Sequence, residues 1–254
     1  MNAARKAAKK AASLTAVALI AALGASQSLA DYEQGDVIVR IGWGLVDPDD
    51  DSDWLRIDNT VYLEDSRVYV DDGDSATFTA TWMFADHFGL GLLAALPFEH
   101  DLDVAGLPDP DTGGLLGKVE LGSIEHLPPT LTVQWFPVCK ESWVQPYVGF
   151  GVNFTTFMDE DISPVAQKYF EDELGALSSA DLDLDDSWGL AGELGVDIMF
   201  GRDSNWLFNA AVWYLDIDTD ATIDFRTRGD YFTRIKTDVD IDPWVYSVGL
   251  GYKF

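Results

Sequence analysis

The C-terminal segment DPWVYSVGLGYKF, residues 242–254, alternates between large apolar side chains and small or polar ones. The apolar positions are Trp244, Tyr246, Val248, Leu250, Tyr252 and Phe254. A period of two is typical of a β-strand whose two faces meet different surroundings. Because aromatic residues occupy both ends of the apolar face, the segment fits a strand that crosses a bilayer with its aromatics at the two interfaces.

The same alternation recurs along the chain and predicts eight strands in all, at residues 37–45, 76–84, 88–96, 131–135, 148–154, 188–200, 206–214 and 244–254. A soluble β-sandwich would show the same alternation. The lengths of the connections between strands distinguish the two folds. Short turns such as FADHF and GRDSN alternate with long segments at roughly 46–74, 97–129, 155–187 and 215–243. An even number of strands with alternating short and long connections is typical of bacterial outer-membrane proteins. We therefore predict an all-β fold, an eight-stranded antiparallel transmembrane β-barrel with short periplasmic turns and long extracellular loops.

The first thirty residues have the pattern of a secretory signal peptide. A basic stretch precedes an apolar run at 16–25, and Ser28-Leu29-Ala30 forms a small-x-small cleavage site. We predict that residues 1–30 are removed and that residues 31–254 form one barrel domain in the outer membrane of a Gram-negative bacterium. The single cysteine, Cys139, has no second cysteine with which to form an internal disulfide.

The mature chain is strongly acidic. Removal of the signal leaves 12 Lys and Arg residues against 44 Asp and Glu residues, a net charge of −32. This charge argues against nucleic acid as a partner. The expected partners are instead outer-membrane lipid and lipopolysaccharide, small hydrophobic solutes, and the barrel-assembly machinery through the strand that ends in Phe254.

Several long segments resemble the OmpW family of outer-membrane barrels. They are FGLGLLAALPFEHD (88–101), EHLPPTLTVQWF (125–136), QPYVGFGVNFTTFMDE (145–160), DSWGLAGELGVDIMF (186–200), NAAVWYLDIDT (209–219) and the terminal DPWVYSVGLGYKF. Together they span most of the mature chain, whereas the acidic long connections depart from the family. The resemblance implies an eight-stranded barrel proposed to pass small hydrophobic molecules across the outer membrane, without enzymatic activity.

The strand residues that alternate with the lipid-facing ones face the barrel interior, and we call their positions the inward parity. These residues form the candidate lumen. Eight strands leave an interior just wide enough to be filled by side chains, so an open channel requires small residues. The inward parity contains four Gly-x-Gly pairs: Gly42 and Gly44, Gly89 and Gly91, Gly149 and Gly151, and Gly249 and Gly251. These glycines either open the lumen or accept a neighbouring ring or relieve curvature. Large apolar residues of the same parity form either an apolar constriction or an ordinary packed plug: Leu93, Trp213, Met83, Phe136, Tyr147 and Met199.

Aspartates recur at alternate positions in the long connections, and two such triplets continue the outward parity of the last two strands. They are Asp216, Asp218, Asp220 and Asp238, Asp240, Asp242. Carboxylate oxygens at this spacing suggest weak Ca²⁺ or Mg²⁺ binding, although neither triplet has the glycine and glutamate of an EF-hand. The other interpretation is a solvated acidic surface. No other cofactor is expected.

An enzyme and a structural or adhesive protein are the two other function classes that a small outer-membrane barrel allows. Catalysis would need a nucleophile beside a base, and Ser123 near His126 is the pair to examine, with His87 and His100 the other histidines. No Gly-x-Ser-x-Gly motif accompanies them, and we predict no enzyme. The alternative to a channel is a structural or adhesive protein whose acidic loops bind a partner or divalent cations. The third long connection contains apolar residues at helical spacing between Pro164 and Ala180, which predict a short amphipathic helix.

Overall fold

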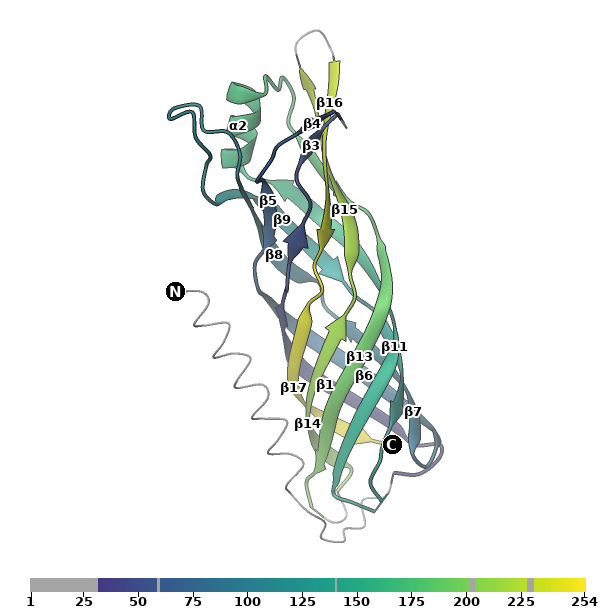
Figure 1. Cartoon of the computed structure of the whole chain (residues 1–254). Helices are drawn as coiled ribbons and strands as arrows, with labels where there is room; N and C mark the ends of the chain where they lie inside the picture. The colour runs from purple at the N-terminus through teal and green to yellow at the C-terminus, as the bar shows by residue number, and fades with distance from the viewer. Residues whose placement is uncertain (1–31, 59, 140, 202–203, 228–230) are drawn as a thin grey trace.

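A computed structural model describes residues 32–254 except residues 59, 140, 202–203 and 228–230 (Figure 1). The predicted signal peptide therefore lies outside the described residues. Among the described residues, no helix combines the length and the apolar character needed to cross a membrane.

Eight strands close into an antiparallel barrel. They are β1 (Val37–Asp47), β6 (Gly73–Ala85), β7 (Phe88–Ala95), β10 (Thr130–Trp135), β11 (Val144–Ile162), β13 (Ser187–Met199), β14 (Trp206–Leu215) and β17 (Trp244–Lys253). The spatial order is β10-β7-β6-β1-β17-β14-β13-β11, and pairing of β10 with β11 completes the circle. Closure satisfies the backbone hydrogen bonds of every strand, as a hydrocarbon environment requires. The predicted fold class and all eight strands are confirmed.

The outer surface of the barrel is apolar. The lipid-facing parity includes Trp188 and Phe150, whose side chains are 74% and 64% exposed, and Ile41 in β1. The opposite parity is buried, as the β14 pattern of alternating burial shows. Large apolar residues thus cover the outer surface of the barrel, which excludes the soluble-sandwich interpretation.

The barrel wall continues well beyond the apolar band, on the side of the long connections (Figure 1). We call this part the outer section, made of β2 (Asp51–Ser52), β3 (Arg56–Ile57), β4 (Val61–Tyr62), β5 (Arg67–Val70), β8 (Phe98–Ala105), β9 (Val119–Leu127), β12 (Asp181–Leu184), β15 (Asp218–Thr227), β16 (Tyr231–Asp240) and helix α2 (Pro164–Glu173). One of its sheets extends β11 in the order β11-β9-β8-β5, and the other has the order β12-β15-β16-β3-β4. The long connections, predicted as extracellular loops, thus consist largely of strands.

Helix α2 lies where the apolar spacing predicts it. Ser163 caps its N-terminus by accepting a hydrogen bond from the Ala166 backbone, and Pro164 occupies the first turn. Phe170 is buried and stacks on Phe225 of β15, with ring centroids 5.5 Å apart. Val165 is exposed, and the helix ends at Glu173, within the segment 164–180 that carries the apolar spacing.

Candidate functional site

The interior of the outer section is apolar. Inward-facing residues of both outer sheets form one buried cluster, which we call the apolar chamber; it includes Leu55, Leu102, Leu121, Ile124, Ile223 and Ile235. Two small cavities lie within it. The volume that the centre of a water molecule can occupy is about 20 Å³ in one cavity and about 40 Å³ in the other. Both cavities border on Leu55, Leu121, Ile223 and Ile235. Since one water needs roughly 10–15 Å³ by this measure, a larger molecule enters only if side chains move.

Two of the predicted lumen residues lie at the base of this chamber. Leu93 of β7 is 5% exposed and Trp213 of β14 is 1% exposed, and both belong to the same buried cluster as the chamber residues. The structure therefore brings these two residues together with the outer apolar interior.

Beneath the chamber lies a layer of buried polar residues centred on an ion pair. Arg40 donates from Nε to Asp197 at 2.8 Å, pairs with the second carboxylate oxygen through Nη2, and donates from Nη1 to Thr81 at 2.8 Å. Asn209 and the Tyr32 hydroxyl also donate to Asp197, at 2.8 and 2.7 Å. Asp197 and Arg40 are 0% and 3% exposed in their side chains, so this pair is excluded from solvent.

The same layer extends across the barrel to a second buried carboxylate. Glu193 accepts hydrogen bonds from Thr132 at 2.9 Å and from Gln134 at 2.8 Å. Thr81 donates to Gln134 at 2.9 Å and so connects the two carboxylates. We call this continuous network the polar layer: Arg40, Thr81, Thr132, Gln134, Glu193, Asp197 and Asn209.

The other four predicted lumen residues close the short-turn end of the barrel. Met83, Phe136, Tyr147 and Met199 are all buried, and they form a second cluster with Tyr32, Ile38 and Leu207. Phe136 contacts Tyr147 and Tyr32 with ring centroids 5.2 and 5.3 Å apart. The order along β1 illustrates the arrangement: Ile38 lies in this plug, Arg40 in the polar layer and Val46 in the apolar chamber.

Neighbouring atoms lie close beside the inward glycines. A Cβ added at Gly91 would meet the side chain of Gln134, one added at Gly149 would lie 2.7 Å from Glu193, and one at Gly251 would lie 2.7 Å from Leu207. Gly44 and Gly89 likewise face threonine side chains, and Gly42, Gly151 and Gly249 face neighbouring backbone. The space beside each of these eight glycines is therefore already occupied by a neighbouring side chain or backbone atom.

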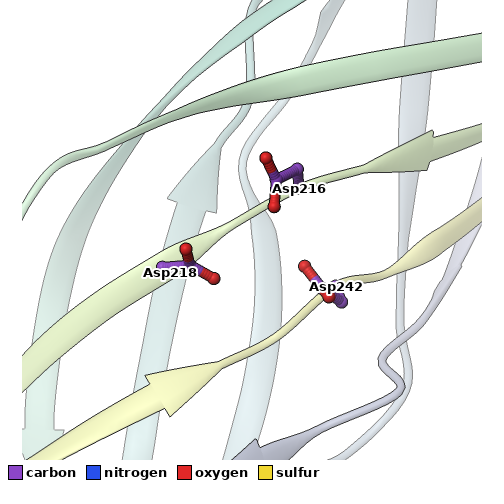
Figure 2. A group of neighbouring side chains, drawn as sticks. All are labelled: Asp216, Asp218 and Asp242. Carbon is purple, nitrogen blue, oxygen red and sulfur yellow. The ribbon is translucent and has the colours of Figure 1, made fainter.

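The two aspartate triplets come together on the outward face of the β15–β16 hairpin. Asp218 lies opposite Asp240 and Asp220 opposite Asp238 in this ladder. Carboxylate oxygens of Asp216, Asp218 and Asp242 lie within 4.8 Å of one another (Figure 2).

The facing carboxylates disfavour each other's ionisation. Partial burial and the nearby Asp240 raise the pKa of Asp218. A hydrogen bond shared with Asp238 raises the pKa of Asp220. The hairpin therefore concentrates negative charge that a cation would relieve.

The histidines do not assemble a catalytic pair. His87 lies in the turn between β6 and β7 and donates from Nδ1 to the Phe136 carbonyl at 2.9 Å. His126 points inward from β9 and is buried, whereas the alternating burial of β9 turns Ser123 towards the opposite face. His126 instead stacks on His100 of β8, with ring centroids 4.7 Å apart.

Some interior partners were not identified from the sequence. Strand parity turns Arg40 and Asp197 inward, but the two residues are 157 positions apart and no local signal pairs them. Tyr32 was also missed because it precedes the first strand.

Comparison with known proteins agrees with this architecture. The model of the OmpW family matches residues 33–254. Outer membrane protein W of Vibrio cholerae is 37% identical over 239 residues, which cover 94% of this chain and 97% of that protein. The crystal structure of outer membrane protein OprG from Pseudomonas aeruginosa superposes with a TM-score of 0.76 at 42% identity, covering 89% of this chain and 99% of that one.

A more distant relative is the Dibenzothiophene metabolism operon protein PahQ of Pseudomonas aeruginosa. It is 26% identical over 200 residues, which cover 76% of this chain and 80% of that protein. None of these three descriptions names an enzymatic activity. The chain belongs to the OmpW family and is a β-barrel protein of the outer membrane of Gram-negative bacteria.

Proposed function

We propose that this protein is a channel through which small hydrophobic molecules pass passively across the outer membrane. The observation that carries the proposal is the apolar chamber, which lines the outer section from its strands down to Leu93 and Trp213. A water-filled pore would need polar inward residues at these positions, whereas an apolar solute loses unfavourable contact with water by entering such an interior. The name of the relative PahQ, which connects that protein to the metabolism of an apolar aromatic compound, supports the same substrate class.

The route is proposed to end in the lipid rather than in the periplasm. Below Leu93 an apolar solute would have to displace the polar layer, whose buried ion pair and hydrogen bonds are costly to separate. Beside Leu93 the wall is less continuous, because the β7–β10 ladder ends at Leu93 and Thr130 and the β8–β9 ladder begins at Phe98 and His126. Pro97, Pro128 and Pro129, between these ladders, have no backbone N–H with which to bridge them. A solute leaving here gains by entering hydrocarbon.

Uptake measurements test the proposal. Cells that produce the protein are expected to take up toluene faster than cells that lack it. Uptake of glycerol, a small polar solute, should not depend on the protein, because the apolar walls of the chamber cannot replace the hydrogen bonds that its three hydroxyl groups make with water. Equal toluene uptake with and without the protein, at matched outer-membrane integrity, would refute the channel.

A second candidate function is cation binding at the outer face, favoured by the cluster of Asp216, Asp218 and Asp242. Ca²⁺ or Mg²⁺ there would bridge the carboxylates to anionic lipopolysaccharide. EDTA is then expected to lower the melting temperature of protein that carries bound lipopolysaccharide. Asp242→Asn should remove the EDTA effect, whereas Asp224→Asn, at a carboxylate that pairs with Arg234, should retain it. A melting temperature that EDTA leaves unchanged would discard this role.

A further inference from the structure

The interior of the outer section contains two buried histidines that neither the barrel nor the proposed channel requires. His100 and His126 are 1% and 2% exposed, and their rings are nearly parallel, at 18°. Their other neighbours are aromatic: Phe98 lies 5.6 Å and Phe157 6.1 Å from His126, centroid to centroid. The two imidazoles therefore place polar atoms within an otherwise aromatic and aliphatic cluster.

The pair is located between the apolar chamber and the base of the route. In the β8–β9 ladder, His100 lies directly opposite Ile124, which lines one of the chamber cavities. His126 lies opposite Phe98, which shares a buried cluster with Leu93. On the proposed route, a solute moving from the cavities towards Leu93 would pass the His126 ring.

The two rings differ in their hydrogen bonding. His100 is held in place because its Nδ1 donates to the Asp71 carbonyl at 2.6 Å. Its Nε2 has no hydrogen-bond partner among the described residues, but it lies against Gly73, where an added Cβ would be 2.9 Å away. Neither Nδ1 nor Nε2 of His126 has a hydrogen-bond partner among the residues that the structure describes. A neutral His126 therefore offers one free donor and one free acceptor to whatever enters the cluster.

His126 is held in this neutral form by its surroundings. Burial, together with the neighbouring His100, lowers its pKa well below the ordinary value of histidine. The acidic groups near the pair, Asp71, Asp72 and Asp101, act on His100, whose pKa burial nevertheless lowers. The ring is thus suited to a neutral hydrogen-bonding group and unsuited to an ionised carboxylate, which the apolar walls would also exclude.

An imidazole at this position is unfavourable unless something engages it. A buried polar group without a partner costs free energy relative to an apolar side chain of similar shape. A route for pure hydrocarbons would be served better by phenylalanine, which already surrounds the site at Phe98 and Phe157.

We propose that His126 is a binding site for the hydroxyl group of a small aromatic or aliphatic solute, so that the substrates include neutral phenols and alcohols as well as hydrocarbons. The hydroxyl either donates its proton to the unprotonated ring nitrogen or accepts the ring N–H through its oxygen, while the hydrocarbon part of the solute remains among the apolar residues. This inference rests on the proposed channel function.

The transport test compares phenol with toluene, which differ by a hydroxyl in place of a methyl group. In cells producing His126→Phe, which keeps a ring beside Phe98 and Phe157, phenol uptake is expected to fall about tenfold, the effect of losing one hydrogen bond. Toluene uptake should remain close to that of the wild type. Phe157→Leu is the matched packing control, because it alters the same cluster and leaves the imidazole intact; it should change both solutes alike. Equal effects of His126→Phe on the two solutes would overturn the proposal.

A binding measurement on the wild-type protein is independent of how the variant folds. Phenol added to purified barrel with ¹⁵N-labelled histidine is expected to shift the ring nitrogen resonances of His126, and toluene at the same concentration should shift them much less. Unchanged resonances with phenol would mean that water or nothing occupies the site, and would overturn the proposal. If uptake of both solutes proves independent of the protein while phenol still shifts His126, the channel function fails and the binding site stands.

Discussion

Asp197→Asn is expected to destabilise the folded barrel by about 3–5 kcal/mol, because it removes the carboxylate from a fully buried ion pair and leaves the Arg40 guanidinium without a counter-charge. The loss includes the ionic hydrogen bonds that Tyr32 and Asn209 now donate to Asp197. Urea unfolding of the purified protein in lipid vesicles measures the difference. Because the ion pair lies at the centre of the polar layer, the variant also tests whether that layer holds the short-turn half of the barrel closed.

The matched control is an exposed ion pair. Arg234 and Asp224 pair in the outer section with side chains 44% and 22% exposed, and Asp224→Asn is expected to cost less than about 1 kcal/mol. If Asp197→Asn costs no more than Asp224→Asn, the guanidinium must be solvated and the polar layer is not a seal.

Gly151→Ala is expected to disturb the junction between β10 and β11, at which the barrel closes. A Cβ at this position would overlap the backbone carbonyl of Leu131, and no side-chain rotation relieves a contact with backbone. Overpacking of this kind costs about 1–3 kcal/mol or more. Slower folding into vesicles and a lower urea midpoint are the expected results.

Gly192→Ala provides the comparison for this variant. Gly192 lies on neighbouring β13, and an added Cβ there meets no atom within 4 Å. This substitution should leave stability unchanged or slightly improved, since alanine restricts the unfolded chain more than glycine does. Equal behaviour of the two alanine variants would mean that the wall at Gly151 has space, as the open-lumen interpretation required.

The barrel was predictable from sequence because lipid imposes one simple rule on every strand. An apolar residue at each second position, as in Phe78, Ala80 and Trp82, identifies the membrane-spanning part directly. The outer section follows the same alternation on its inner side, with Ile223 and Phe225 of β15 buried. Its outward positions are charged, however, as at Asp218 and Asp220. Strands whose outer face meets water lack the lipid signal, so the sequence alone does not distinguish them from loops.

The sequence predicts which side chains of the candidate site face the barrel interior. It does not predict at which level of the barrel they lie or which residues they contact. Parity correctly turned Leu93 and Met83 inward, yet it could not place one in the chamber cluster and the other in the plug. It also could not tell that the space beside Gly91 is taken by Gln134. Such facts depend on which strands are neighbours and in which register, and local sequence does not specify these.

The measurement that tests the account most directly is toluene uptake by cells that produce Ala221→Trp or Thr222→Trp. Ala221 faces the chamber from β15 and lines one of its cavities, whereas the adjacent Thr222 lies on the opposite face of the same strand. With both variants assembled in the outer membrane at wild-type levels, Ala221→Trp should reduce uptake to that of cells lacking the protein, and Thr222→Trp should match the wild type. Undiminished uptake with Ala221→Trp would show that toluene does not pass through the apolar chamber, and would contradict the proposed route.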